Sequence, residues 1–235
     1  MGRAFEYRKA RKFARWDKMS KTFTRIGREI AMSVKAGGPE PESNTRLRAA
    51  IQNAKAANMP KDRVEAAIKK AANKDEKAYE EVVYEGYAPH GIAVLVETAT
   101  DNPTRTVANV RHVFSKYGGA MGTSGSVGFL FERKALFRLD PGDMAAEDLE
   151  LQLIDAGAED ISIEDGEWNL TAAFTDFGQV QKSLESIGIQ IVSSELSYIP
   201  TITKTLDEAQ AEDCLKLIEM LEEDDDVQNV YCTLA

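Results

Sequence analysis

Apolar residues recur with helical periodicity in the first third of the chain and form short runs in the rest. Steps of three and four residues predict a helix face made of Phe23, Ile26, Ile30 and Val34. The glycines at 37 and 38 should end this helix. Similar spacing predicts a second helix around Leu47–Ala54 and a third that begins near Pro60. The first 74 residues are therefore expected to form a small helical bundle.

From Tyr79 onward, short apolar runs between turn residues indicate strands alternating with helices. We expect strands at Val82–Tyr84, Ile92–Val96 and Ser126–Phe131. Asn102 and Pro103 should open the helix that lies between the second and third of these.

Residues 135–200 show the order β-α-β-β-α-β, which is typical of a ferredoxin-like unit. After Pro200 we expect a Thr-rich strand, then a helix opened by a capping box from Thr205 to Glu208, then a last strand at Val227–Cys232. The predicted fold class is α plus α+β in three domains. These are a basic helical domain (1–78), an α+β middle domain (79–134 plus 201–235) and an acidic ferredoxin-like domain (135–200) inserted in the middle one.

Charge is divided very unevenly along the chain. The net charge of the 235 residues is −10 at pH 7, which by itself argues against binding to nucleic acid. Residues 1–74 nevertheless carry 19 basic and 7 acidic side chains, whereas residues 75–235 carry 10 and 32. A basic segment on an acidic protein suggests a nucleic-acid partner for that segment alone.

The remaining composition points to a cytoplasmic protein. No apolar run approaches the roughly 20 residues that cross a bilayer, and the basic N-terminus lacks the apolar core of a secretory signal. The two cysteines, Cys214 and Cys232, have no metal-site or disulfide-framework spacing, which suits a reducing compartment.

The basic residues of the helical domain are the leading candidates for binding phosphate, because Lys and Arg release counterions when they neutralise it. Phe5, Tyr7 and Trp16 lie among them and could stack on bases. The alternative is a helix face that docks on the acidic domains of the same protein. The candidates are Arg3, Arg8, Lys9, Arg11, Lys12, Arg15, Lys18, Lys21, Arg25, Arg28, Lys55, Lys61, Arg63, Lys69 and Lys70.

A second candidate group, Arg105, Arg111 and His112, lies on one predicted helix of the middle domain. It could extend the phosphate-binding surface, or it could pair with neighbouring acids, and the sequence leaves both possibilities open.

No pattern indicates catalysis, a cofactor or a metal. The two histidines lack a nucleophile at a recognisable spacing. The glycines from 118 to 128 follow a helix and precede a strand, the reverse of a phosphate-binding loop, so we expect a helix end and a turn. The five acids from Glu222 to Asp226 are expected to form a solvated turn.

Several long motifs resemble the YebC family. They are the segment from Ala36 to Asp62, which contains Gly-Gly-Pro-Glu-Pro-Glu-Ser-Asn, then Tyr84-Glu-Gly-Tyr87, Thr100-Asp-Asn-Pro-Thr-Arg105 through Phe114, and Gly125-Ser-Val127. The resemblance implies a helical N-terminal domain and two α+β domains, the third inserted in the second. Bacterial members are described as probable transcriptional regulators, and the mitochondrial member as a translational activator. The common opening Gly-His-Ser-Lys-Trp is replaced here by Gly-Arg-Ala-Phe-Glu-Tyr-Arg-Lys, which puts any function of that opening in doubt.

Together, residues and resemblance predict a monomeric, non-enzymatic, nucleic-acid-binding regulator of gene expression, conventionally a DNA-binding transcriptional regulator. One alternative is a translation factor that binds RNA or the ribosome. The alternative from another class is a protein-interaction scaffold without nucleic acid.

Overall fold

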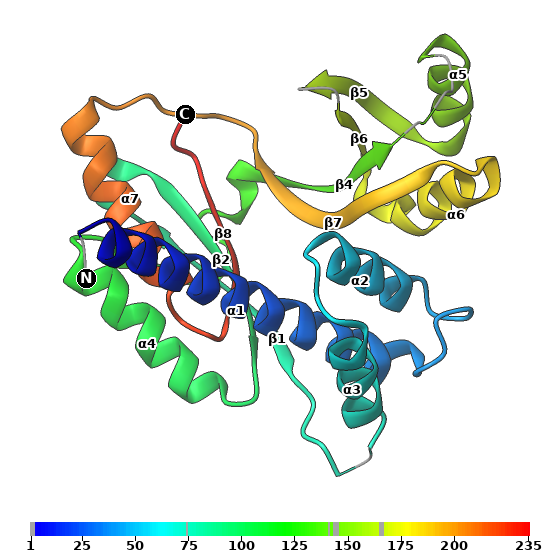
Figure 1. The fold of residues 1–235 in the computed structure, drawn as a ribbon. Helices are drawn as coiled ribbons and strands as arrows, with labels where there is room; N and C mark the ends of the chain where they lie inside the picture. Colours follow the sequence, from blue (N-terminus) through cyan, green and yellow to red (C-terminus); the bar gives the residue numbers. More distant parts are fainter. Residues whose placement is uncertain (1–2, 74, 141, 143–145, 165–166) are drawn as a thin grey trace. The chain divides into compact units, whose positions relative to one another are not determined.

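The computed structural model describes residues 3–73, 75–140, 142, 146–164 and 167–235, without the side chains of residues 3–18, 146–147 and 164. The chain divides into two compact units, Met1–Glu76 (unit 1) and Lys77–Ala235 (unit 2). Unit 1 is helical, and its helices are α1 (Arg3–Gly37), α2 (Thr45–Ala56) and α3 (Lys61–Ala72) (Figure 1).

Small apolar side chains form the core of unit 1. Ile30 and Val34 of α1 pack with Leu47 and Ala50 of α2 and with Val64 of α3. The predicted helix face is thus confirmed for Ile26, Ile30 and Val34, and α1 ends at Gly37 as predicted.

Asn44 holds the turn between α1 and α2. Its amide donates to the carbonyl oxygens of Ser33 (2.7 Å) and Gly38 (2.9 Å), and its side-chain oxygen accepts from the N–H of Leu47 (3.0 Å). A side chain at position 37 would meet Asn44 at 2.8 Å, so a residue without Cβ is required there.

Unit 2 contains two four-stranded antiparallel sheets. Sheet A has the order β3-β1-β2-β8 and consists of β1 (Glu80–Tyr87), β2 (Ala93–Thr100), β3 (Ala120–Met121) and β8 (Val227–Cys232). Sheet B has the order β5-β6-β4-β7 and consists of β4 (Phe131–Asp140), β5 (Ala158–Glu164), β6 (Glu167–Ala173) and β7 (Gln190–Pro200). The mixed class predicted from the sequence is confirmed.

Helices cover one face of each sheet. Sheet A packs against α4 (Pro103–Lys116) and α7 (Glu208–Glu222), with Phe114 and Leu217 fully buried among its strands. Sheet B packs against α5 (Ala146–Ala156) and α6 (Phe177–Ile187). Short 3-10 turns lie at Pro89–Gly91, Gly128–Leu130 and Phe174–Asp176.

The expected strand at Ser126–Phe131 is wrong. The carboxylate of Glu85, on β1, accepts hydrogen bonds from the backbone N–H groups of Gly125, Val127 and Gly128, each at 2.7 Å. Because these amides are bound to a side chain, they are not available to a sheet ladder. The third strand of sheet A is instead the short β3, and Phe131 begins β4 of sheet B.

Two expectations after Pro200 are also wrong. The Thr-rich segment is not a strand, and it forms only an isolated bridge between Lys204 and Leu234. Helix α7 is capped by Asp207, whose carboxylate accepts from the N–H of Gln210 (2.9 Å), rather than by Thr205. Asp207 directly precedes the helix, where a short acceptor side chain reaches the free amides of the first turn.

Among the described residues, no helix is long and apolar enough to cross a membrane.

Candidate nucleic-acid interface

The first group of candidates lies on α1. The helical backbone places Arg3, Arg8, Lys9, Arg11, Lys12, Arg15 and Lys18 on the N-terminal half of this 35-residue helix, but their side chains lie outside the described part of the structure. Lys21, Arg25 and Arg28 follow on the same helix, are half-buried, and each interacts with another residue of the chain.

Arg63 connects α3 to α1. Its guanidinium lies over the ring of Phe23, 5.8 Å from the centroid. This arrangement leaves the edge of the guanidinium without a hydrogen bond to any described residue, and an Arg edge suits the bidentate recognition of phosphate. The structure thus brings the α3 candidate Arg63 beside the α1 segment that carries Lys21 and Arg25.

The remaining unit 1 candidates are exposed on α2 and α3. Lys55 and Lys69 form no hydrogen bond or ion pair within the described part of the chain. Lys61 pairs with Glu65 at 3.5 Å and Lys70 with Glu76 at 3.0 Å, both at the surface. Exposed pairs of this kind are weak and exchange readily with phosphate.

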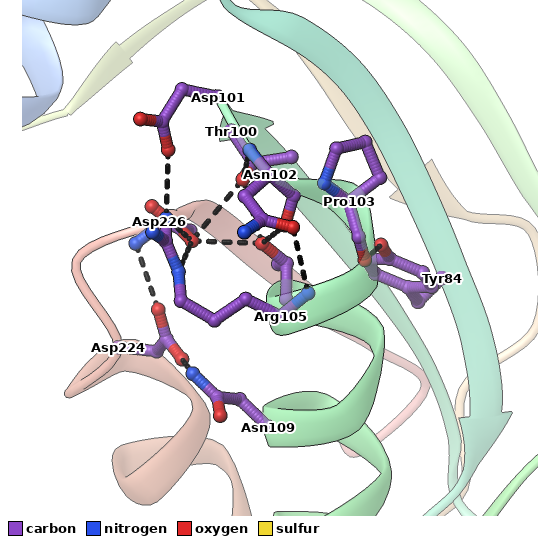
Figure 2. Close-up of polar contacts among 10 residues, drawn as sticks. Tyr84, Thr100, Asp101, Asn102, Pro103, Arg105, Asn109, Asp224 and Asp226 are labelled. Atoms are coloured by element: carbon purple, nitrogen blue, oxygen red, sulfur yellow. Dashed lines mark hydrogen bonds and ion pairs between the residues drawn. The ribbon is translucent and has the colours of Figure 1, made fainter.

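Arg105, at the start of α4, is held by two carboxylates (Figure 2). Its Nη2 lies 2.6 Å from Oδ2 of Asp226 and 2.9 Å from Oδ1 of Asp101. The hydrogen bonds to Asp226 and then to Asp101 raise the pKa of the Arg105 guanidinium. Of the two possibilities that the sequence left open, this geometry favours pairing with acids for Arg105.

Arg111 and His112 lie further along α4 and are exposed. Neither forms a hydrogen bond or an ion pair with a described residue. They are therefore accessible to a ligand, but they do not form a cluster with Arg105, whose guanidinium is occupied.

Asp226 is the residue that sequence reasoning missed. Its side chain is 4% exposed, and its Oδ2 accepts from the hydroxyls of Thr106 (2.8 Å) and Thr100 (3.2 Å) as well as from Arg105. The expectation of a solvated turn at Glu222–Asp226 is wrong for this last residue. The sequence indicates the burial of Asp226 only weakly, because the apolar Val227 beside it is the one sign that the chain returns to the core there.

The neighbouring polar groups complete this connection. Asn102 caps α4, as predicted, by accepting from the N–H of Arg105 at 3.2 Å. Asn109, one turn further on, donates to Asp224 at 2.9 Å. The cluster therefore fastens α4 to the segment before β8, and its polar side chains bind one another.

Two basic side chains of sheet B are neutralised locally. Lys134 pairs with Glu132 (2.6 Å) and Glu159 (2.8 Å), and Arg138 pairs with Glu167 (3.1 Å). Carboxylates therefore already match these two cations, as they do for Arg105.

The structure offers no metal centre in its described part, where no three His, Cys, Asp or Glu side chains are placed around one point. Cys214 is buried and its thiol donates to the carbonyl of Pro89 at 3.2 Å. Burial raises the pKa of this thiol, which keeps it protonated and unreactive.

Comparison with known proteins assigns both units to one family. Residues 3–74 match the model of the TACO1/YebC protein N-terminal domain, and residues 79–234 match that of the TACO1/YebC second and third domain. A protein of Flavobacterium johnsoniae is 58% identical over 234 residues, covering 100% of this chain and 99% of its own length. A protein of Myxococcus xanthus is 52% identical over 240 residues, with complete coverage of both.

Both relatives are named probable transcriptional regulatory protein. The crystal structure of a conserved hypothetical protein from Aquifex aeolicus is similar, with a TM-score of 0.79 and 41% sequence identity. The match covers 92% of this chain and 90% of that one. With both domain models matched and such close relatives, the chain belongs to the TACO1/YebC family.

Proposed function

We propose that this protein is a cytoplasmic, nucleic-acid-binding regulator of transcription that contacts DNA through unit 1. The observation that carries the proposal is the concentration of basic charge in residues 1–74, with 19 basic and 7 acidic side chains. Within that unit, Lys55, Lys69 and Arg63 are exposed and have donors that no described carboxylate occupies. The names of the close relatives support the regulatory role.

The acidic remainder restricts which surface can approach DNA. Residues 75–235 carry 32 acidic against 10 basic side chains, and several of these bases are paired. A phosphate backbone is repelled from such a surface. Binding through unit 1 is thus mainly electrostatic, with little reading of base sequence by unit 2.

Sheet B offers little support for RNA binding in the manner of sheet-based RNA readers, which stack bases on aromatic side chains. Phe137 points into the core with Ala135 and Leu139, so Lys134, Leu136 and Arg138 lie on the opposite face, away from α5 and α6. The positions paired with these three residues are Ala173, Thr171 and Asn169 on β6 and Ser197, Glu195 and Ser193 on β7. None of them is aromatic.

We also propose the three-domain division predicted from the sequence, with boundaries at 1–78, 79–134 plus 201–235, and 135–200. The strand order supports it, because sheet A takes strands from both sides of the segment that forms sheet B. The order β5-β6-β4-β7, with α5 and α6 on one face, supports a ferredoxin-like inserted domain.

The test is an affinity measurement with the full chain and a fluorescent duplex DNA of arbitrary sequence, repeated over a range of salt concentrations. We expect Lys55→Glu with Lys69→Glu to weaken binding. The slope of log affinity against log salt should become shallower by about 0.9 for each phosphate that the variant no longer neutralises. The matched control is Lys182→Glu with Lys216→Glu, which makes the same charge change on exposed positions of unit 2.

Three results would argue against the proposal. Equal weakening by both double variants would show a general charge effect without a binding surface. Absence of binding at low salt would favour the scaffold alternative. Much tighter binding to ribosomal RNA than to duplex DNA at the same salt would favour a translation factor.

A further inference from the structure

Helix α5 exposes large apolar side chains that its own core does not use. Leu149 and Leu153 point inward and are completely buried against sheet B. Leu151 and Ile154 remain 68% and 61% exposed. Because they are three positions apart, they lie side by side on the outer surface of the helix.

Carboxylates flank this apolar pair on both sides. Among the side chains of α5 that the structure describes, at 100° per residue, Leu151 and Ile154 lie near the middle of the outer face, Glu150 lies at one margin, and Asp148 and Asp155 lie at the other. All three acids are exposed. An apolar centre with a charged rim is the usual arrangement of a protein-binding surface.

The charge around this face selects the partner. Residues 135–200 contain 14 acidic and only 2 basic side chains. Phosphate is therefore repelled from α5, whereas a cationic protein surface is attracted to it. The exposed apolar pair additionally favours a partner with aliphatic side chains, because a purely polar cation would leave Leu151 and Ile154 in water.

We propose that the outer face of α5, from Asp148 to Asp155, docks a basic amphipathic segment of another protein. The aliphatic residues of the segment would cover Leu151 and Ile154, and its Lys and Arg residues would pair with Asp148, Glu150 and Asp155. This surface is separate from the residues of unit 1 assigned to nucleic acid.

The experiment titrates the full chain with two labelled synthetic helical peptides of equal positive charge. One carries Leu at three- and four-residue steps among Lys, and the other has Gln in place of each Leu. We expect the Leu peptide to bind about tenfold more tightly, since each buried aliphatic side chain contributes appreciably. Leu151→Gln with Ile154→Gln should remove this advantage, and Asp148→Lys with Asp155→Lys should weaken the binding of both peptides.

The matched control is Leu215→Gln, which changes another exposed leucine (54% exposed) on the acidic helix α7 and should leave peptide binding unchanged. Unaltered urea unfolding of each variant establishes that the fold is intact. Equal affinity for the two peptides would overturn the proposal. So would an affinity for the Leu peptide that does not change in the Leu151→Gln, Ile154→Gln variant. Sedimentation that shows self-association abolished in the Leu151/Ile154 variant would assign the face to a second copy and overturn it as well.

Discussion

Asp226 and Arg105 lie 121 positions apart in the sequence, and their side chains meet at 2.6 Å. The carboxylate is almost completely buried, while the guanidinium remains half-exposed. Asp226 precedes β8, and Arg105 lies in the first turn of α4. The contact therefore joins the last strand of sheet A to a helix that comes before the sheet B segment in the sequence. The hydroxyls of Thr100 and Thr106 bind the same carboxylate oxygen.

Removal of this carboxylate should destabilise unit 2. Asp226→Ala removes the buried partner of the Arg105 guanidinium and one acceptor of the Thr100 and Thr106 hydroxyls, so we expect the free energy of unfolding to fall by about 3 kcal/mol. Asp225→Ala, which changes the exposed neighbour, should alter it by less than about 0.5 kcal/mol. Urea unfolding followed by circular dichroism measures both. Similar decreases for the two variants would contradict a specific role of Asp226.

Glu85 should make stability depend on pH. Burial tends to raise the pKa of this carboxyl, but backbone N–H groups of Gly125, Val127 and Gly128 bind its charged form and bring the pKa below the usual 4.5. Stability from the ionised group is therefore fully present above pH 4.5 and is lost as pH falls through the lower folded pKa. Glu85→Gln should cost about 2 kcal/mol at pH 7, because buried donors lose charged acceptor oxygens.

Denaturant unfolding at several pH values provides the measurement for Glu85. The difference between the original protein and Glu85→Gln should shrink as pH falls below 4.5. Glu80→Gln, at the exposed start of the same strand, is the control and should change the free energy of unfolding little at pH 7. If the stability difference between the original protein and Glu85→Gln stayed constant down to the lowest pH at which the protein folds, Glu85 would not be a source of pH-dependent stability.

Glu97 should behave in the opposite way. Burial raises the pKa of its carboxyl, and the hydrogen bonds from Asn229 (3.2 Å) and Tyr231 (3.1 Å) only partly offset this. The folded state therefore favours the protonated form, and the ionised group lowers stability at neutral pH. We expect Glu97→Gln to raise the free energy of unfolding at pH 7, with the gain lost as pH falls through the raised folded pKa toward the usual 4.5. A decrease in stability at pH 7 would show that the two hydrogen bonds outweigh burial.

Two glycines should respond oppositely to alanine. A Cβ at Gly86 would lie 2.6 Å from the carbonyl oxygen of Ala120 and 2.9 Å from Phe114, so Gly86→Ala should destabilise unit 2 by roughly 2 kcal/mol or more. Gly27, inside α1, has nothing within 4 Å of its Cβ position. Gly27→Ala should stabilise unit 1 by about 0.5–1 kcal/mol through helix propensity. Thermal unfolding would test both, and a neutral Gly86→Ala would show that β3 can move away.

Local sequence patterns determined most of the elements. Apolar residues at three- and four-residue steps were sufficient for the α1–α3 core, because helix periodicity depends only on nearby residues. Asn102 and Pro103 fixed the start of α4 for the same reason, since the cap reaches only the first turn. The division of charge between residues 1–74 and 75–235 is likewise a property of the sequence alone.

Tertiary structure decided which polar groups are buried and which basic side chains are paired with carboxylates. The loop at Gly125–Gly128 is not a strand because Glu85, some 40 positions earlier, binds its amides. Asp226 belongs to an acidic run that looks solvated, yet Arg105, Thr100 and Thr106 approach it from distant positions and satisfy its charge. Desolvation and hydrogen bonding depend on neighbours in space, so residue type and local spacing could not separate Asp226 from Asp225, or Arg105 from Arg111.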